Sequence, residues 1–293
     1  MSRLHPGRGL DHLIHLVRDL DAAVAAYERL GFAVSGENRH PFGTKNRIVQ
    51  LPGVFLELLA VGDHAPIPEH GGRSFSFAAF HRDRLARMGE GGSAVVLASR
   101  DGAADAAAYA AAGIGDFEPF FFERRGRRPD GSEVHVAFEL AFAVDAESPD
   151  TAFFACEHKH PENFWSAAAQ RHPNMATGVP GIVLTAENPS DHHVFLKEFT
   201  GVRDFRASSL GLAIPTPNGE IEVLTPGAFT QRTGVAAPGG TGLRLAAIRV
   251  AVADLGAAER GAGGRATRRG DLLVVPAGEL FGLTLTLEAA AKD

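Results

Sequence analysis

The sequence predicts an α+β protein built from four βαβββ modules in tandem. The first module shows the pattern: Leu10–Val17 is an apolar run of strand length, and Ala22–Leu30 repeats its apolar residues at helical spacing. Asp19 and Gly31 lie where a helix cap and a helix end are expected. The pattern then recurs along the chain. Repetition of a unit that cannot bury its own apolar face indicates modules that pack on one another.

Three further apolar runs are expected to complete the first module as strands. Turn residues separate them, with Gly43 before the second run and Pro52-Gly53 before the third. The predicted strands are Phe32–Ser35, Ile48–Leu51 and Val54–Val61. A connecting helix capped by Ser74 or Ser76 is expected next.

Module two repeats module one at a constant offset. Ala94–Asp116 aligns with Leu13–Val34, so that Asp101 falls on Asp19 and Gly113 on Gly31. The expected elements are a helix over Asp101–Ala112 and strands over Phe117–Arg124, Glu133–Phe142 and Thr151–His158. The residues Pro129-Asp130-Gly131 predict a turn between the first two of these strands.

Modules three and four are weaker copies. Module three starts with a strand at Gly181, followed by a helix around Asp191–Phe199 and strands near Ser209–Ile214 and Glu220–Leu224. A Pro- and Gly-rich linker, Pro226–Gly242, leads to module four. Glycines cost about 1 kcal/mol each relative to alanine inside a helix, so this module should have only a short one. Its closing strands are expected at Leu272–Val275 and Phe281–Leu287.

Length and composition agree with two domains of a protein that works in solution. With 293 residues the chain is expected to divide into domains at 9–178 and 179–293. The net charge of −6 argues against nucleic acid or an anionic membrane as the main partner. No long apolar run or apolar N-terminal signal region is present, which predicts a cytoplasmic location. The single cysteine, Cys156, excludes an internal disulfide and is expected to be a buried apolar residue.

Two groups of residues carry a family resemblance. Gly9–Phe32 followed by Phe55–Val61 resembles the opening module of the vicinal-oxygen-chelate superfamily, which includes glyoxalase I, extradiol dioxygenases and bleomycin-resistance proteins. Arg39–Asn46 and Arg171–Val179 are similar to its glyoxalase-like domain proteins. The resemblance implies that two modules pair into a half-open barrel of mixed sheet around a divalent metal ion, such as Zn, Ni, Mn or Fe. The usual metal ligands are a histidine on the first strand and a glutamate on the last strand of a module.

His12 and Glu57 occupy these two positions in module one. Glu57 also attracts attention without the resemblance, because its neighbours on the strand are apolar, from Phe55 to Leu59. A carboxylate in such surroundings costs several kcal/mol unless it is paired or bound to a metal. The alternatives are a core histidine at position 12 and a solvent-facing strand position at 57.

Module two departs from the family pattern, because Ala94 and Val95 stand where a second histidine is expected. Its last strand offers Glu157 and His158, which must point to opposite faces. Glu157 is favoured as the inward ligand by its match to the acidic position of the family, with His158, His160 or His135 as substitutes. The expected metal set is therefore His12, Glu57 and Glu157, with His158 as the alternative, and the two glutamates are the expected catalytic groups. The alternative is that the site binds no metal.

A further set of polar residues is expected to contact the substrate's oxygens at the mouth of the barrel or, alternatively, to fix local backbone. This set contains Arg39, His40, Thr44, Asn46, His135, His172 and Asn174. The second half of the chain reads as structural, a lid or a homodimer surface. Ala247 and Thr284 take the ligand positions of module four, and Glu222 of module three has no matching histidine.

Three functions fit these residues. The first is a metal-dependent lyase or isomerase, in which the ion binds two neighbouring oxygens of a small substrate and a glutamate transfers the proton. The second is a ring-cleaving dioxygenase, which needs two histidines and one carboxylate, such as His12 and His158 with Glu57 or Glu157. The third is a metal-free binding protein, like the resistance proteins of the superfamily.

Overall fold

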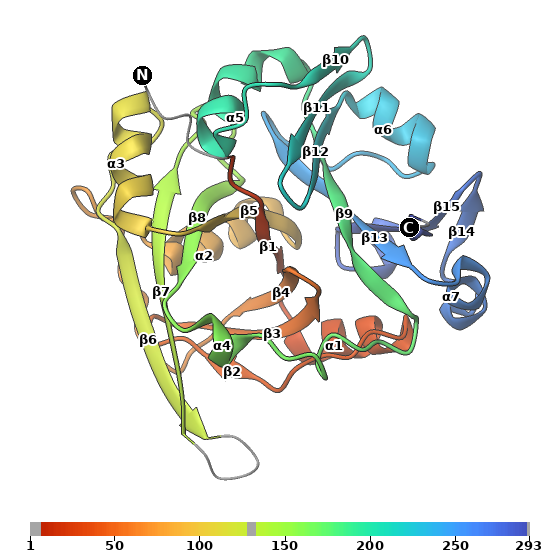
Figure 1. Ribbon diagram of the computed structural model, residues 1–293, viewed down its shortest axis with the longest axis horizontal. Helices are drawn as coiled ribbons and strands as arrows, with labels where there is room; N and C mark the ends of the chain where they lie inside the picture. Colours follow the sequence, from red (N-terminus) through yellow and green to blue (C-terminus); the bar gives the residue numbers. More distant parts are fainter. Residues whose placement is uncertain (1–6, 128–132, 292–293) are drawn as a thin grey trace.

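The fold consists of two curled sheets of eight strands each. The computed structural model describes residues 7–127 and 133–291. In Figure 1 the first sheet lies on the left and the second on the right. The first sheet has the order β2-β3-β4-β1-β5-β8-β7-β6. Its strands are β1 (Leu10–Leu16), β2 (Asn38–Arg39), β3 (Thr44–Leu51), β4 (Val54–Val61), β5 (Gly91–Ser99), β6 (Phe120–Arg127), β7 (Glu133–Ala143) and β8 (Ala152–His158).

The second sheet repeats this topology in the order β10-β11-β12-β9-β13-β16-β15-β14. Its strands are β9 (Ala176–Thr185), β10 (Arg206–Ser208), β11 (Gly211–Thr216), β12 (Gly219–Leu224), β13 (Arg244–Val252), β14 (Thr267–Arg269), β15 (Leu272–Val275) and β16 (Thr284–Ala289). Within each module the first and last strands pair in parallel, and the first strands of paired modules join antiparallel. The prediction of an α+β fold with four modules pairing into two mixed sheets is confirmed.

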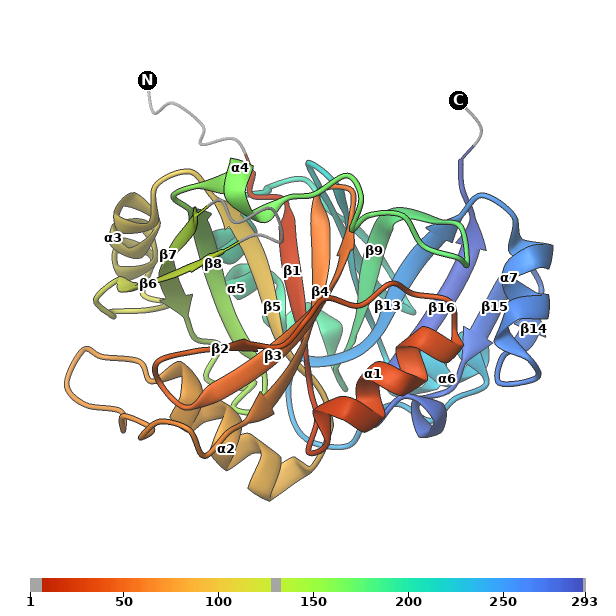
Figure 2. The same ribbon diagram turned by 90° about the horizontal axis from the view of Figure 1, so that it is seen from below.

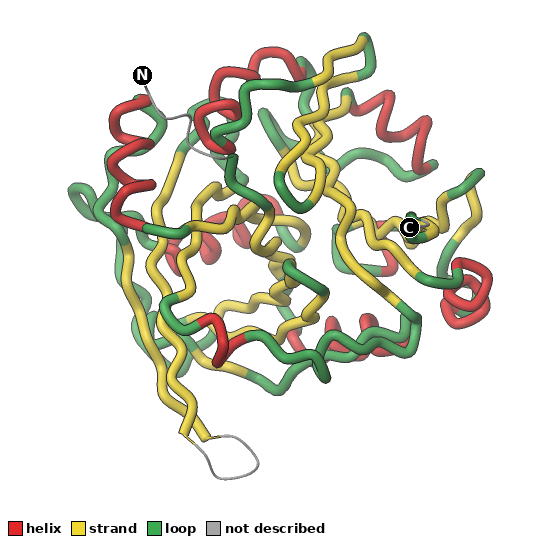
Figure 3. The backbone as a smooth tube through the Cα atoms, viewed as in Figure 1, coloured by secondary structure: helices red, strands yellow, loops and turns green. Residues whose placement is uncertain are grey.

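Helices surround the two sheets (Figure 3). They are α1 (Leu20–Arg29), α2 (Phe77–Met88), α3 (Gly102–Ala112), α4 (Pro161–Phe164), α5 (His193–Thr200), α6 (Pro226–Thr233) and α7 (Leu255–Ala262), with 3₁₀ turns at Pro189–His192 and Ala277–Glu279. The first helix of modules one, two and four begins with an aspartate as its N-cap. Asp19, Asp101 and Asp254 each accept a hydrogen bond from a backbone N–H three residues on. Among the described helices, none is long and apolar enough to span a bilayer.

Alternation along the strands divides the apolar side chains into separate cores. Leu13 of β1 and Val17, which follows the strand, belong to the large core between the convex faces of both sheets and their helices. Ile14 and Leu16 face the other way, into the concave side of the first sheet. Figure 2 shows the central strands of the two sheets next to each other in the middle of the molecule.

A helix closes the concave side of each sheet. Phe77 and Leu85 of α2 pack into the concave core of the first sheet. In the second sheet Phe229 of α6 is fully buried against Val183 and the β13 alanines. The pair α2 and α6 therefore occupy corresponding places after the first module of each half.

Two predicted segments differ from the structure. Phe32–Ser35 is not a strand, because Phe32 is buried against the rings of Tyr27 and His172 while the short β2 takes the place beside β3. The predicted linker Pro226–Gly242 begins with helix α6, capped by Thr225 and with Pro226 in its first turn. The turn predicted at Pro129-Asp130-Gly131 lies outside the described residues.

Candidate functional site

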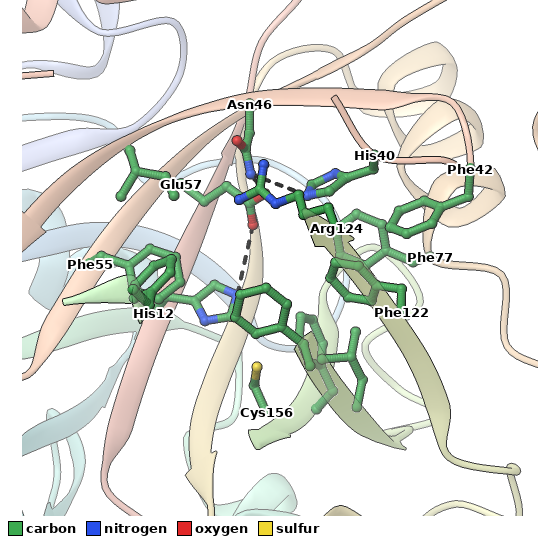
Figure 4. A pocket seen from close by; sticks show the side chains of 15 residues that line it. His12, His40, Phe42, Asn46, Phe55, Glu57, Phe77, Phe122, Arg124 and Cys156 are labelled. Atoms are coloured by element: carbon green, nitrogen blue, oxygen red, sulfur yellow. Dashed lines mark hydrogen bonds and ion pairs between the residues drawn. The ribbon is translucent and has the colours of Figure 1, made fainter. Parts of the chain in front are cut away.

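A small cavity lies inside the first half-barrel, between the concave sheet and α2. Its volume is about 40 Å³, which is room for a few waters or a small chemical group. Seven of the described lining residues are phenylalanines, and its polar lining residues are His12, His40, Asn46, Glu57 and Arg124, with Cys156 beside them (Figure 4).

The structure brings His12 and Glu57 together in this cavity. They come from the adjacent parallel strands β1 and β4. His12 Nε2 lies 3.7 Å from Glu57 Oε2, and both side chains are buried. The imidazole stacks on Phe55, with ring centroids 4.3 Å apart, so its orientation is fixed by packing as well as by charge.

Asp11 holds the other edge of the His12 ring. The β1–β5 register shifts at this residue, and such a bulge re-aims a side chain. Asp11 Oδ2 lies 2.6 Å from His12 Nδ1, and Oδ1 lies 3.1 Å from His158 Nε2. Burial alone would raise the pKa of Asp11, but the two imidazoles outweigh it and lower the pKa to about 2. An ionised Asp11 favours a proton on Nδ1 of His12, which leaves Nε2 free to accept a proton on the cavity side.

Asn46 holds Glu57 from the opposite side. Its amide nitrogen donates to Glu57 Oε1 at 2.5 Å, and the amide orientation is set by Asn38, which donates to Asn46 Oδ1 at 3.0 Å. Oε2 of Glu57 is thereby left facing His12. Burial raises the pKa of the Glu57 carboxyl, opposed by His12, Asn46 and Arg124. Burial therefore favours the protonated form of Glu57 more than water does, which suits a group that carries a proton.

His40 and Thr44 support Asn46. His40 Nδ1 lies 2.8 Å from Thr44 Oγ1, and its Nε2 lies 3.4 Å from the Asn46 amide nitrogen. Burial lowers the pKa of His40 to about 3, so the ring is neutral and Nε2 can accept. Of the residues expected to contact substrate, His40 and Asn46 line the cavity, and Thr44 lies behind them.

Glu157 and His158 lie on opposite faces of β8, as alternation requires. Glu157 lies on the convex face, where Oε2 accepts from the Gly102 backbone N–H at the start of α3 and pairs with Lys159. It is thus away from His12 and Glu57, on the other face from the one expected. His158 lies on the concave side but meets Asp11, not Glu57.

The remaining predicted contacts lie outside the cavity. Arg39 is exposed and paired with Glu37, and His135 pairs with Glu123 on the neighbouring strand. His172 and Asn174 bind backbone instead. The two His172 ring nitrogens contact Ala33 N and Gln50 O, and Asn174 donates to Leu30 O and accepts from Ala176 N; this ties the chain after module two to α1.

The donors of a divalent metal centre are only half present. His12 and Glu57 provide two, but the corresponding positions in module two, by the β5–β8 register, are Ala94 and Phe154. Two protein ligands are fewer than the three of a typical catalytic zinc site. Asp11, His12 and Cys156 also lie within 4.8 Å of one another, but the Asp11–His12 hydrogen bond already occupies that edge of the ring. The described residues therefore supply two donors of such a centre, and an ion there would need its remaining donors from water or substrate.

Among the described residues of the second half-barrel, an ion-paired cluster takes the place of the His12–Glu57 pair. Glu222, in the place of Glu57, pairs with Arg249 at 3.1 Å and with Arg232 at 2.8 Å. Arg249 also pairs with Glu288 of β16 at 3.0 Å. These half-buried charges on α6 and on the strands are held in ion pairs that link the helix to the sheet.

Residues 10–200 match the glyoxalase-like domain family, so the chain belongs to this family of the vicinal-oxygen-chelate superfamily. No curated protein sequence matches the chain. Among solved structures, a hypothetical protein from Staphylococcus aureus is similar over 96% of this chain and 99% of its own, with 12% identity and a TM-score of 0.64.

Two further solved structures share the fold. A mutant of 4-hydroxymandelate synthase from Streptomyces coelicolor is similar over 99% of this chain and 95% of its own, with 12% identity and a TM-score of 0.56. A fusion protein of a xylose isomerase-like TIM barrel and 4-hydroxyphenylpyruvate dioxygenase is similar over 98% of this chain and 50% of its own, with 14% identity and a TM-score of 0.53. At these identities the likeness establishes the fold alone.

Sequence reasoning missed Asp11 and Arg124 at this site. Asp11 carried the same signal as Glu57, a carboxylate within an apolar strand, LDHLIHL. Arg124 shares strand β6 with Arg125 and Arg127, so nothing in the sequence pattern singles it out as the arginine that reaches the cavity.

Proposed function

We propose that the chain is an enzyme of vicinal-oxygen-chelate type that moves a proton on a small substrate, as a lyase or an isomerase does. The observation that carries the proposal is the pair of His12 Nε2 and Glu57 Oε2, 3.7 Å apart in a cavity walled by phenylalanines. Two titratable groups with different surroundings, at one place, supply both a base and an acid.

The roles follow from the hydrogen bonds. His12 acts as the base that removes a proton from a carbon next to a carbonyl, and the ionised Asp11 stabilises the imidazolium that forms. Glu57, whose pKa burial raises, donates a proton to the substrate on the other side. Asn46 positions Glu57, and the phenylalanines exclude water, so that the charges act at low dielectric.

A divalent ion held by His12 and Glu57 is the second candidate, favoured by their separation, since two metal–ligand bonds of about 2.1 Å span such a distance. Bound there, an ion would act as a Lewis acid on two neighbouring oxygens of the substrate. Water or the substrate would have to supply the missing donors. A ring-cleaving dioxygenase fits less well, because His158 Nε2 is hydrogen-bonded to Asp11.

The test is hydrogen exchange in D₂O. The purified full chain is incubated with a panel of small carbonyl acids, and deuterium incorporation at the carbon next to the carbonyl is followed by NMR. We expect exchange that falls by about 100-fold or more in His12→Gln and in Glu57→Gln. Exchange by both variants at the wild-type rate, or no exchange of any panel member by the wild type, would contradict the proposal.

Elemental analysis of the same protein decides between the two candidates. Exchange by protein without stoichiometric metal supports the acid–base pair. A stoichiometric transition metal that is lost in both variants supports the second candidate. Homodimerisation, the cytoplasmic location and the domain division at 178/179 stay predictions.

A further inference from the structure

Arg124 lies at the junction of two cavities. It lines the inner cavity that holds His12 and Glu57, and it also lines a larger outer pocket of about 460 Å³ between β2–β3, β6–β7 and α4. Ile48 and Phe164 line both as well, so the two spaces adjoin at these three side chains. Figure 4 shows the Arg124 guanidinium beside Asn46 and Glu57.

The Arg124 guanidinium has no fixed partner within the described part of the chain. Its Nε is buried without a hydrogen-bond partner, and the charge of Glu57 acts on it without a hydrogen bond or ion pair between these two described side chains. By contrast, Arg249, which is half-buried like Arg124, is paired with Glu222, and the buried Arg244 is paired with Asp150. A desolvated guanidinium without a partner costs several kcal/mol, so its retention calls for an explanation.

The charge around the junction is positive. The described lining of the outer pocket includes Arg39, Arg124 and Arg125 against one acid, Glu37, which Arg39 already pairs. Such a mouth attracts anions. The planar fork of one guanidinium matches a carboxylate through two parallel hydrogen bonds.

From this placement we infer that the substrate is a small carboxylic acid whose carboxylate binds Arg124, with its reacting carbon inward beside His12 and Glu57 and its remaining atoms in the outer pocket. The inner volume of about 40 Å³ admits only a few atoms beyond the guanidinium, whereas about 460 Å³ outside accommodates the larger part of a ligand. A phosphate dianion fits less well, because the carboxylate of Glu57 lies on the same side. The inference rests on the proposed function for the identity of the reacting end, but the binding of the carboxylate can be measured by itself.

Trp165 provides the readout, since it is the only tryptophan in the chain. Its ring centroid lies 5.1 Å from that of Phe164, which lines both cavities, and 5.8 Å from that of Phe55. Tryptophan fluorescence of the full chain is titrated with benzoate and phenylacetate, with their uncharged amides, and with inorganic phosphate. We expect the carboxylates to bind at least 10-fold more tightly than the amides and than phosphate.

Arg124→Gln should weaken carboxylate binding by about 10- to 100-fold, the loss expected for hydrogen bonds to a charged group, and leave amide binding unchanged. Arg203→Gln, at an exposed arginine of the second half, is the matched control and should bind as the wild type does. Thermal unfolding of both variants verifies that they are folded. Equal binding of carboxylates and amides by the wild type, tighter binding of phosphate than of carboxylate, or unchanged carboxylate binding by folded Arg124→Gln, would overturn the inference.

The two proposals fail separately. If His12→Gln and Glu57→Gln abolish exchange while Arg124→Gln binds carboxylates normally, the acid–base pair stands and the carboxylate assignment is lost. If carboxylates bind through Arg124 but the wild type exchanges no proton, the chain binds small acids without acting on them, and the proposed reaction is lost.

Discussion

At the scale of single residues, Asp11 contacts the site from behind without lining the cavity. It joins His12 and His158, and its own charge is stabilised by both. A carboxylate behind a histidine base fixes the tautomer and stabilises the imidazolium, so its removal lowers the rate without removing the base.

Asp11→Asn tests this role. The amide keeps the shape of the side chain but not its charge, so we expect the deuterium exchange rate to fall by about 100-fold or more, with little change in substrate affinity. The rate and the substrate concentration at half-saturation are measured by NMR across pH. Asp105→Asn, at a carboxylate of α3 that is paired with Arg8 and does not line the cavity, is the control. A rate for Asp11→Asn equal to that of the control would show that Asp11 only supports the fold.

Cys156 gives a second prediction at this scale. Burial raises its pKa well above the usual range, and nearby carboxylates add to the effect. Because the thiolate is the reactive form, the thiol of the folded protein should resist a disulfide reagent at pH 8 and react rapidly in denaturant. With one cysteine in the chain, the absorbance of the released thiol reports it directly. Rapid labelling of native protein would mean that the concave core opens more readily than its packing indicates.

At the scale of elements, helix α6 distinguishes the two half-barrels. Phe229 is fully buried on the concave side of the second sheet, and Arg232 of the same helix pairs with Glu222. The first half-barrel keeps a cavity in the corresponding place. The concave side of the second sheet is therefore filled by a side chain, whereas that of the first keeps the cavity with the polar site.

Phe229→Ala measures how much this packing contributes. Removing a buried phenylalanine ring should lower the free energy of unfolding by about 3–5 kcal/mol, because it leaves a cavity that the sheet and helix cannot fill. Urea unfolding gives the value. Deuterium exchange per folded chain should stay at the wild-type level, and a loss of exchange in the folded variant would argue that the second half takes part in the reaction.

Helices and strands with a clear hydrophobic periodicity could be predicted from the sequence, and so could the proximity of His12 and Glu57. The Asp caps and apolar runs of modules one and two gave β1, β4, α1 and α3 within a few residues. The helix α6 was missed because its Pro226 and Gly227 resemble a linker, although proline at the first turn is compatible with a helix.

Which face of β8 is inside could not be decided from the sequence. Phe153 and Ala155 on one face and Phe154 and Cys156 on the other are equally apolar, because both faces of this sheet are covered. Alternation separates Glu157 from His158 but does not say which of them points inward. The bulge that places Asp11 beside His12 likewise cannot be recognised from the order of apolar residues in the sequence.

At the scale of the whole molecule, three buried neutral histidines are expected to make the stability of the fold depend on pH. His15 lies between the sheets, with Nδ1 3.0 Å from Tyr27 Oη and Nε2 3.2 Å from the Phe281 carbonyl oxygen. His81 Nδ1 bonds the Phe77 carbonyl oxygen within α2, and His40 lies in the site. Burial lowers the pKa of His15 to about 4 and those of His40 and His81 to about 3.

These shifts predict that the fold loses stability in mild acid. An unfolded histidine takes up its proton near pH 6.5, whereas these three remain neutral in the folded chain, so the unfolded state binds up to three more protons below that pH. The free energy of unfolding should be constant above about pH 7 and fall as the pH drops from 6.5 towards 4. The slope approaches about 1.4 kcal/mol per pH unit for each histidine.

Urea unfolding at pH 7.5, 6.5, 5.5 and 5.0 measures this slope. His81→Gln removes one titrating group away from the polar site, and the slope below pH 6.5 should then fall by up to the contribution of one histidine, about 1.4 kcal/mol per pH unit. His193→Gln, at an exposed histidine of α5, should leave the slope unchanged. If the stability of the wild type does not change between pH 7.5 and 5.0, the three rings are protonated in the folded state. In that case the neutral His40 that accepts from Asn46 would be lost from the site.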